Sequence, residues 1–189
     1  MQKSMKSVLA LALLSGVSIS AIAADQGHGQ VNFIGEIVNA PCSINPESVD
    51  QTVDLGQISN TALKAGGTSP NKTFTIQLED CDFTGADGTG STIGNGIELT
   101  FTGSTNAEKL LGVTGFGSDV NGQNVGIQIN DAKNKQVMFG EAIDLTNTLQ
   151  NGNNTLLFNS FLKGKAGTTV EQIPLGNFWG VTNFTIEYK

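Results

Sequence analysis

The last fourteen residues of the chain, Gly176–Lys189, read GNFWGVTNFTIEYK and decide the predicted fold. From Thr182 onward, polar and apolar residues alternate with the period of a β-strand. One face of this strand carries Thr182, Phe184, Ile186 and Tyr188. Chain ends usually fray, so an apolar strand face that reaches the penultimate residue must be buried by something.

A second alternating stretch, Val31–Val38, lies near the other end of the chain and is the natural candidate to bury the apolar face of the C-terminal strand. One of its faces carries Val31, Phe33, Gly35 and Ile37. The opposite face carries Asn32, Ile34 and Glu36. The two stretches together predict that apolar strand faces from opposite ends of the sequence meet, either within one molecule or between molecules.

The composition predicts a single all-β domain. At 189 residues the chain is most simply one domain, and only 14% of the residues are charged while Gly is abundant at 24 residues. Such a profile is typical of short strands joined by tight turns. The ten cationic residues are all Lys and the net charge is −7, which argues against a nucleic-acid partner.

The first 23 residues have the pattern of a secretory signal peptide. Lys3 and Lys6 form a positive region, Val8–Val17 is an apolar core too short to span a bilayer, and Ala21 and Ala23 are the small residues of a cleavage site. We therefore expect cleavage before residue 24 and export of the protein.

The only two cysteines, Cys42 and Cys81, are expected to form a disulfide, because an exported protein with an even pair of cysteines favours one. A bridge that closes a loop of about 40 residues would stabilise the fold by roughly 4 kcal/mol in the chain-entropy model. A pair of reduced thiols is the alternative. Two cysteines without a nearby His cannot make a closed zinc site.

Further strands are predicted at near-regular spacing between the two alternating stretches. They are Val49–Leu55, Lys72–Leu78 running on to Cys81, Ile97–Thr102, Val125–Ile129, Gln136–Phe139 and Leu156–Leu162. A single helical turn is expected at Ser59–Lys64, and a long loop at Gly85–Gly96. Many short strands with turns between them indicate a β-sandwich or a barrel.

No group of residues points to catalysis or to a cofactor. The single His28 lies between two glycines, where an imidazole cannot be held in the geometry of a catalytic triad. Glu79, Asp80 and Asp82 have ligand types that Ca²⁺ accepts, but the solvated end of a strand explains them as well. Gly112–Gly117 lacks the Lys and the following helix of a phosphate loop. We therefore expect a protein that is not an enzyme and has no metal ion or cofactor.

Several features in a fixed order support a family resemblance. They are the leader up to Ala40-Pro41-Cys42, Cys81 after the alternating Phe74, Ile76 and Leu78, the stretch Val125–Asp131, Leu156–Phe158, and the ending from Gly176, fourteenth from the end, to Tyr188. In these features the sequence after residue 23 resembles the major pilins of type 1 and P fimbriae, which belong to the bacterial chaperone–usher pathway. Asn183 and the long Gly85–Gly96 loop depart from the family pattern.

The resemblance implies an incomplete immunoglobulin-like β-sandwich, residues 39–189, that lacks its last strand and is completed by a neighbouring subunit. Residues 24–38 would be the donor extension, inserting Val31, Phe33, Gly35 and Ile37. The receiving groove and the chaperone-binding strand would include Gly176, Phe184, Ile186, Tyr188 and Lys189. A glycine in a strand often marks close backbone approach, so we expect Gly35 to lie where the groove is narrowest.

The implied partners are other copies of the chain and related pilins, a periplasmic chaperone and an outer-membrane usher, with a host receptor reached only indirectly through a tip adhesin. The implied location is the cell surface. Three alternatives stay open at this point. Val31–Val38 could complete its own sheet, the chain could be a minor adaptor pilin, or it could be a sugar-binding adhesin module.

Overall fold

The structure is a computed structural model that describes residues 29–84, 96–116 and 124–189. The chain divides into two units, Met1–Ile37 and Val38–Lys189. The predicted signal peptide, residues 24–28 of the leader with His28, and most of the predicted loop at Gly85–Gly96 lie outside the described residues. The predicted domain boundaries stay predictions.

In the first unit, the described residues 29–37 form no helix or strand. The large apolar side chains of this stretch are exposed, and Phe33 keeps 91% of its surface open to solvent. A Cβ placed on Gly35 would meet no atom within 4 Å. Val31–Val38 is therefore not a strand of any sheet in the described chain, although its alternating pattern alone predicts a β-strand.

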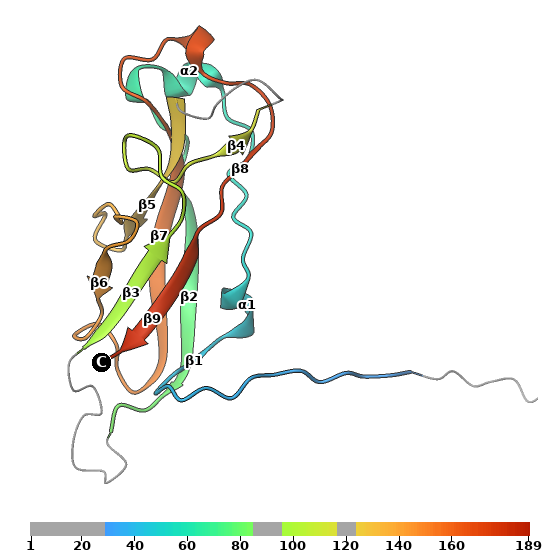
Figure 1. The fold of residues 1–189 in the computed structure, drawn as a ribbon, viewed down its shortest axis with the longest axis vertical. Coiled ribbons are helices and arrows are strands. Elements are labelled where there is room, and N and C mark those ends of the chain that lie inside the picture. Colours follow the sequence, from blue (N-terminus) through green and yellow to red (C-terminus); the bar gives the residue numbers. More distant parts are fainter. Residues whose placement is uncertain (1–28, 85–95, 117–123) are drawn as a thin grey trace, which may run out of the picture. The chain divides into compact units, whose positions relative to one another are not determined.

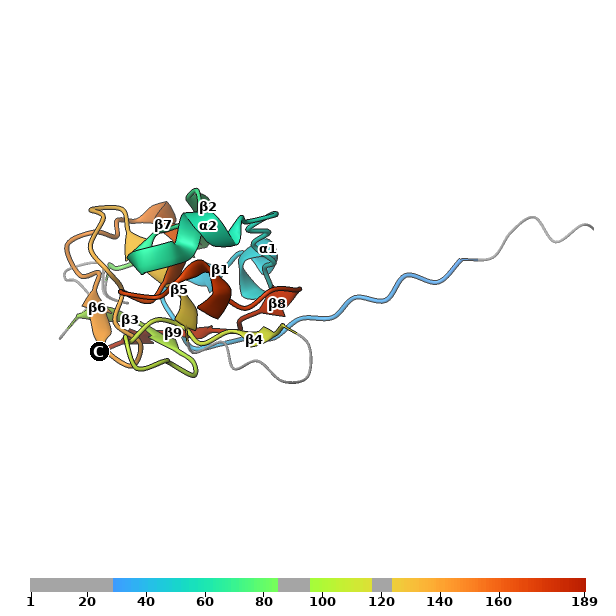
Figure 2. The ribbon, with the colours of Figure 1, turned by 90° about the horizontal axis from the view of Figure 1, so that it is seen from above.

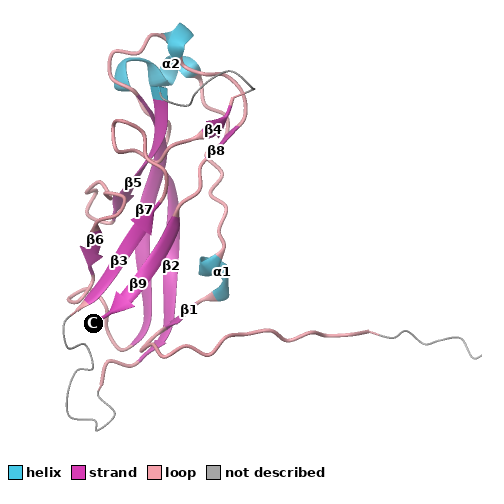
Figure 3. Ribbon diagram, in the orientation of Figure 1, coloured by secondary structure: helices cyan, strands magenta, loops and turns pink. Residues whose placement is uncertain are grey.

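Among the described residues of the second unit, four strands form an antiparallel sheet in the order β1-β2-β7-β5 (Figures 1 and 3). Their bounds are Ser43–Ile44 (β1), Lys72–Cys81 (β2), Gly152–Gly164 (β7) and Val125–Asp131 (β5). β2 pairs with β7 over its whole length, while β1 covers only Leu78 and Glu79 of β2. The longest strand, β7, thus lies in the middle of the sheet.

A second sheet of the described residues has the order β6-β3-β9, with bounds Ala142–Asp144 (β6), Ile97–Thr102 (β3) and Asn183–Tyr188 (β9). β9 pairs with β3 along all six of its residues, from Asn183 opposite Thr102 to Tyr188 opposite Ile97. A separate pair joins Thr114–Gly115 (β4) to Phe178–Trp179 (β8). Figure 2 shows the second unit from above.

The two sheets pack face to face around one main core. The ring of Phe101 on β3 lies 5.1 Å from the ring of Phe158 on β7, in an edge-on contact, and Phe74 of β2 stacks on Phe158 at 5.4 Å. Ile76, Leu78, Ile97 and Leu99 are fully buried between the sheets. The predicted all-β sandwich is confirmed.

Short helices connect the strands. They are Pro46–Val49 (α1), Asn60–Leu63 (α2) and the 3-10 turns Lys64–Gly66 (η1) and Val170–Gln172 (η3). The predicted helical turn at Ser59–Lys64 is confirmed by α2. Leu63 is buried in a second, smaller apolar cluster with Val125, Leu162 and Ile173, so α2 and η1 close one end of the sandwich.

The predicted strand at Val49–Leu55 is wrong. Val49 ends α1, which starts because Asn45 caps it and Pro46 occupies its first turn. Residues 50–55 pair with no strand in the described part of the chain. Their alternating apolar residues reflect half-burial of Val53 and Leu55 rather than membership of a sheet.

The predicted strand at Gln136–Phe139 is also wrong. Only Gln136 makes a bridge, to Asn130 of β5, and a turn follows with Gly140 at a φ of +82°. The strand forms three residues after Phe139, at β6, because there the backbone runs beside the edge of β3. An available edge, not local alternation, decides where this strand lies.

No described helix is long and apolar enough to span a membrane. The described residues also contain no group of three His, Cys, Asp or Glu side chains that could hold a metal ion, and this includes Glu79, Asp80 and Asp82.

Candidate functional site: the open edge of the C-terminal strand

β9 is an edge strand with one unpaired side. It pairs with β3, and no strand of the described chain pairs with its other edge. An unpaired strand edge exposes backbone donors and acceptors that can template pairing with another chain. On the opposite side of the sandwich, Leu111 and Gln136 bridge to the outer edge of β5.

The inward face of β9 brings together the residues that the sequence singled out. Phe184, Ile186 and Tyr188 alternate with exposed residues and are all half-buried against the main core. The ring of Phe184 lies 6.3 Å from that of Phe101. Burial raises the pKa of the Tyr188 hydroxyl above its ordinary value. The edge therefore carries apolar surface that the sandwich covers only in part.

The first sheet is also incompletely covered at its β1–β2 edge. Beyond β1, the described chain meets the backbone of β2 on this edge through isolated bonds. The Asn45 N–H donates to the Gln77 carbonyl at 3.0 Å, the Gln77 N–H donates to the Ser48 hydroxyl at 3.0 Å, and the Gln51 side chain donates to the Thr75 carbonyl at 2.9 Å. An open hollow lies between residues 51–54 and residues 72–75. Neither sheet is closed by a full-length strand at these two edges.

Gly176 starts the C-terminal stretch in a conformation that suits glycine. Its φ is +122°, a backbone region that residues with a Cβ rarely adopt. It precedes β8, where Phe178 stacks on Phe116 at 5.8 Å. The glycine thus turns the chain into the run that ends as β9.

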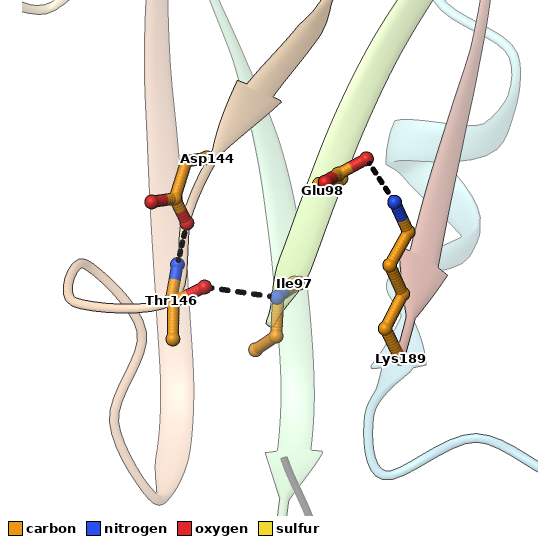
Figure 4. A network of polar contacts seen from close by, with 5 residues as sticks. All are labelled: Ile97, Glu98, Asp144, Thr146 and Lys189. Carbon is orange, nitrogen blue, oxygen red and sulfur yellow. Dashed lines mark hydrogen bonds and ion pairs between the residues drawn. The ribbon is translucent and has the colours of Figure 1, made fainter. Parts of the chain in front are cut away.

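The final residue is fixed by a network of polar contacts (Figure 4). The Lys189 N–H donates to the Gly96 carbonyl at 2.9 Å, and its Nζ donates to Oε2 of Glu98 at 2.7 Å. The hydrogen bond to Glu98 raises the pKa of Lys189. On the other side of β3, Thr146 donates to Asp144 and accepts a bond from the Ile97 N–H. The two bonds of Lys189 fix the end of β9 on β3, and the bonds of Thr146 fix the start of β3 beside β6.

Cys42 and Cys81 form the expected disulfide. The bridge joins the residue before β1 to the last residue of β2, and the Asp82 N–H donates to the Pro41 carbonyl beside it at 2.9 Å. The chain therefore enters the second unit at a covalently fixed point.

Some features of the site were missed by sequence reasoning. The departure at Asn183 proves harmless to the core, because Asn183 points outward and is exposed. Trp179 and Val181 point outward as well, and more than 60% of each side chain is open to solvent. The position of β9 at the edge of its sheet was not foreseeable, since strand order depends on the whole topology.

The comparisons with known proteins agree with one another. The sequence profile of the fimbrial protein family matches residues 31–189. The Fimbria A protein of Serratia marcescens is 44% identical over 97% of this chain and 98% of its own length. The major MR/P fimbria protein of Proteus mirabilis is 42% identical over 96% of this chain and 97% of its own.

Solved structures give the same result. The chain is similar to a subunit of a chaperone–usher pilus, with a TM-score of 0.69 and 33% identity over 87% of this chain and 97% of the other. It is also similar to the P pilus rod subunit PapA, with a TM-score of 0.60 and 32% identity over 79% of this chain and 100% of the other.

These matches and the two-sheet fold establish the fold class as an incomplete immunoglobulin-like sandwich. They show a structural pilin and not an enzyme, since the relatives are named fimbrial proteins. The chain belongs to the fimbrial protein family and is a structural pilus subunit that is exported to the bacterial cell surface.

Proposed function

We propose that copies of this chain are joined in the fimbrial rod by donated strands, with residues 31–37 of one copy inserted along β9 of the next. A single observation carries the proposal. One unit of the chain has an edge strand with a partly covered apolar face, and the other unit has alternating apolar residues that are fully open to solvent.

The energetics of insertion are favourable. Val31, Phe33 and Ile37 lie on one face of the leader, and burying each is worth about 1.5–3 kcal/mol. Pairing with the free edge of β9 adds backbone hydrogen bonds, as in other cases of strand addition. The seven residues 31–37 span about 23 Å as a strand, whereas the six residues of β9 span about 20 Å. The leader is therefore long enough to cover the whole open edge.

Gly35 would let the inserted backbone approach the acceptor closely. On the inward face of β9, the ring of Phe184 already lies beside that of Phe101 on the neighbouring strand β3. A donor residue with a side chain would compete with such a ring for the same space, and glycine does not. Ile34, on the other face of the leader, would stay at the surface of the joined subunits.

A periplasmic chaperone and an outer-membrane usher complete the proposal. An open edge beside apolar surface is an aggregation hazard, so the exported subunit would need its edge held until a donor arrives. We propose that the chaperone pairs with β9 and binds the terminal carboxylate of Lys189, which the network around Gly96 and Glu98 keeps at a fixed place. The usher would then replace the chaperone with the donor strand of the next subunit. Contact with a host receptor would be made by a separate tip adhesin.

A place in the rod is favoured over that of a minor adaptor. The similar proteins that span nearly the whole chain are named a major fimbria protein and a major pilin, and one similar structure is named a rod subunit. Counting copies of this chain per fibre in purified fimbriae would test the assignment, since a rod subunit should outnumber all others.

The test of the donated strand is a one-residue insertion between Phe33 and Ile34. A strand alternates with period two, so the insertion brings Ile34 and Glu36 onto the face of Val31 and Phe33. Inserting a strand with a buried, unpaired carboxylate is strongly unfavourable. We expect no fibres by electron microscopy, with an intact chaperone complex by co-purification.

The matched control is the same insertion between Gly29 and Gln30, ahead of the alternating stretch, which should still give fibres. Normal fibres from the Phe33–Ile34 insertion would refute the proposal. Loss of the chaperone complex as well would show that the leader belongs to the core of its own domain.

A further inference from the structure

The second unit has two ends that differ in charge. At the disulfide end, β2 ends at Cys81, β3 begins at Ile97 and β9 ends at Tyr188 (Figure 1). At the helical end, β7 ends at Gly164 beside η1. The strand registers place a group of carboxylates at the disulfide end and a group of lysines at the helical end.

Carboxylates gather at the disulfide end. Glu98 of β3 lies directly opposite Asp144 of β6 on one side and opposite Glu187 of β9 on the other. Like charges opposite each other weaken a sheet, and the single ammonium of Lys189 forms its ion pair with Glu98. Hydrogen bonds from Thr146 hold the pKa of Asp144 below its ordinary value, so this carboxylate is ionised. The end of β2 adds more acidic residues, namely Glu79, Asp80 and, just beyond it, Asp82.

Lysines gather at the helical end. Lys64 begins η1, and Lys163 and Lys165 flank the last residue of β7. The two segments cross there, because the Gly164 N–H donates to the Gly67 carbonyl and the Ala65 N–H donates to the Thr168 carbonyl, both at 2.9 Å. Lys64 and Lys165 are exposed. Glu171 in η3 is the carboxylate that lies near them in the described part of this end.

We infer that the acidic disulfide end of one copy docks against the basic helical end of the next, and that these charges steer subunits into head-to-tail order. The inference rests on the proposed strand donation. Only residues 38–41 separate the inserted stretch from Cys42, so the disulfide end of the donor must lie close to the point where its leader leaves the acceptor.

The direction of the donated strand decides which ends meet. β9 runs toward the disulfide end, so a donor antiparallel to it runs toward the helical end. It leaves β9 beside Asn183, at the end of β9 that faces the helical end, and residues 38–41 then continue toward Lys64 and Lys165. A parallel donor would leave at the other end and bring two acidic ends together. The charge distribution therefore favours antiparallel insertion.

The test compares polymerisation rates of the exported protein by light scattering, with fibres verified by electron microscopy. The variant Lys64→Glu with Lys165→Glu makes both ends acidic. We expect its initial rate to be about tenfold lower than wild type at low salt, in the range seen for electrostatic steering, and the difference to vanish at high salt. Adding Asp80→Lys with Glu187→Lys to the same chain reverses both ends and should restore the rate.

The matched control is Lys133→Glu with Lys135→Glu, which gives the same net charge. These lysines lie in the turn after β5, whose last residue Asp131 faces Phe158 in the middle of β7 and thus lies at neither end. This variant should polymerise like wild type. An equal slowing in the control, or no recovery in the doubly reversed chain, would overturn the inference.

A synthetic peptide of residues 24–38 separates this inference from the proposed function. The peptide carries the leader without a second unit, so its insertion tests strand donation alone. If it inserts into every variant and the Lys64→Glu, Lys165→Glu chain still polymerises at the wild-type rate, charged docking is wrong and strand donation stands. If it fails to insert into the wild-type protein, both are wrong.

Discussion

The leader and the C-terminal strand have the same sequence pattern and opposite structures. Val31–Val38 and Asn183–Tyr188 both alternate apolar with polar residues. The second is a strand on the edge of β3, whereas the described part of the first is neither helix nor strand and is exposed. Alternation makes a stretch fit to be a strand, and a free edge decides whether it becomes one.

The same substitution in the two regions should therefore have different consequences. Phe184→Asp places a carboxylate against Phe101 in the core of the second unit. Because Phe184 is half-buried, the loss of the ring should cost less than the roughly 3–5 kcal/mol of a fully buried Phe, and a partly buried, unpaired charge adds to this cost. We expect the subunit to be degraded in the periplasm and to lose its chaperone complex, as measured by immunoblot and co-purification.

Asn183→Asp is the control on the same strand, because Asn183 is exposed on the outward face. It should accumulate like wild type. A soluble, chaperone-free monomer of Phe184→Asp at normal levels would mean that this face of β9 is not where the partner binds.

Phe33→Asp should leave the subunit itself intact. Phe33 is 91% exposed, so its replacement costs the isolated subunit almost nothing, while insertion of an aspartate beside β9 would be unfavourable. We expect normal amounts of chaperone complex and no fibres by electron microscopy. Asn32→Asp, on the other face of the leader, should still assemble. If the Phe33→Asp subunit were as unstable as the Phe184→Asp subunit, the leader would contribute to the stability of its own subunit as β9 does, and the proposed difference between the two regions would be wrong.

The smallest effect concerns alkaline pH and Tyr188. Burial raises the pKa of this hydroxyl above its ordinary value of 10.0, so the folded state holds the proton more tightly than the unfolded state does. Its contribution to stability is complete below the unfolded pKa and is lost as pH rises through the folded pKa. Above about pH 10, the urea midpoint of wild type should fall more steeply than that of Tyr188→Phe. Parallel pH profiles would show that Tyr188 is not buried in solution.

The long strands of the sandwich could be predicted from sequence. Lys72–Cys81 and Ile97–Thr102 each have one apolar face that packs inward, and such a face leaves its period in the sequence. The two-residue strands β1, β4 and β8 have no period to detect. Val49–Leu55 was predicted wrongly because Val49 belongs to α1 and residues 51–54 are separated from the edge of β2 by an open hollow. β6 was missed because its pairing comes from the position of β3.

The candidate site divides in the same way. The inward residues of β9 and the two cysteines were chosen from local patterns, and Lys189 was chosen from the family resemblance. The acidic row from Asp144 through Glu98 to Glu187 could not be, because it depends on the register of three strands that are far apart in sequence.

The disulfide has a mechanical consequence in the proposed fibre. Tension along the rod would enter each subunit through its leader at Cys42, next to β1, whose two paired residues would peel easily on their own. The bridge passes the pull from Cys42 directly to Cys81 at the end of β2, which is held by pairing to β7 along its length. Pulling at this point therefore shears a long strand pair and bypasses the weak β1 pairing, so each subunit resists extension before its sandwich opens.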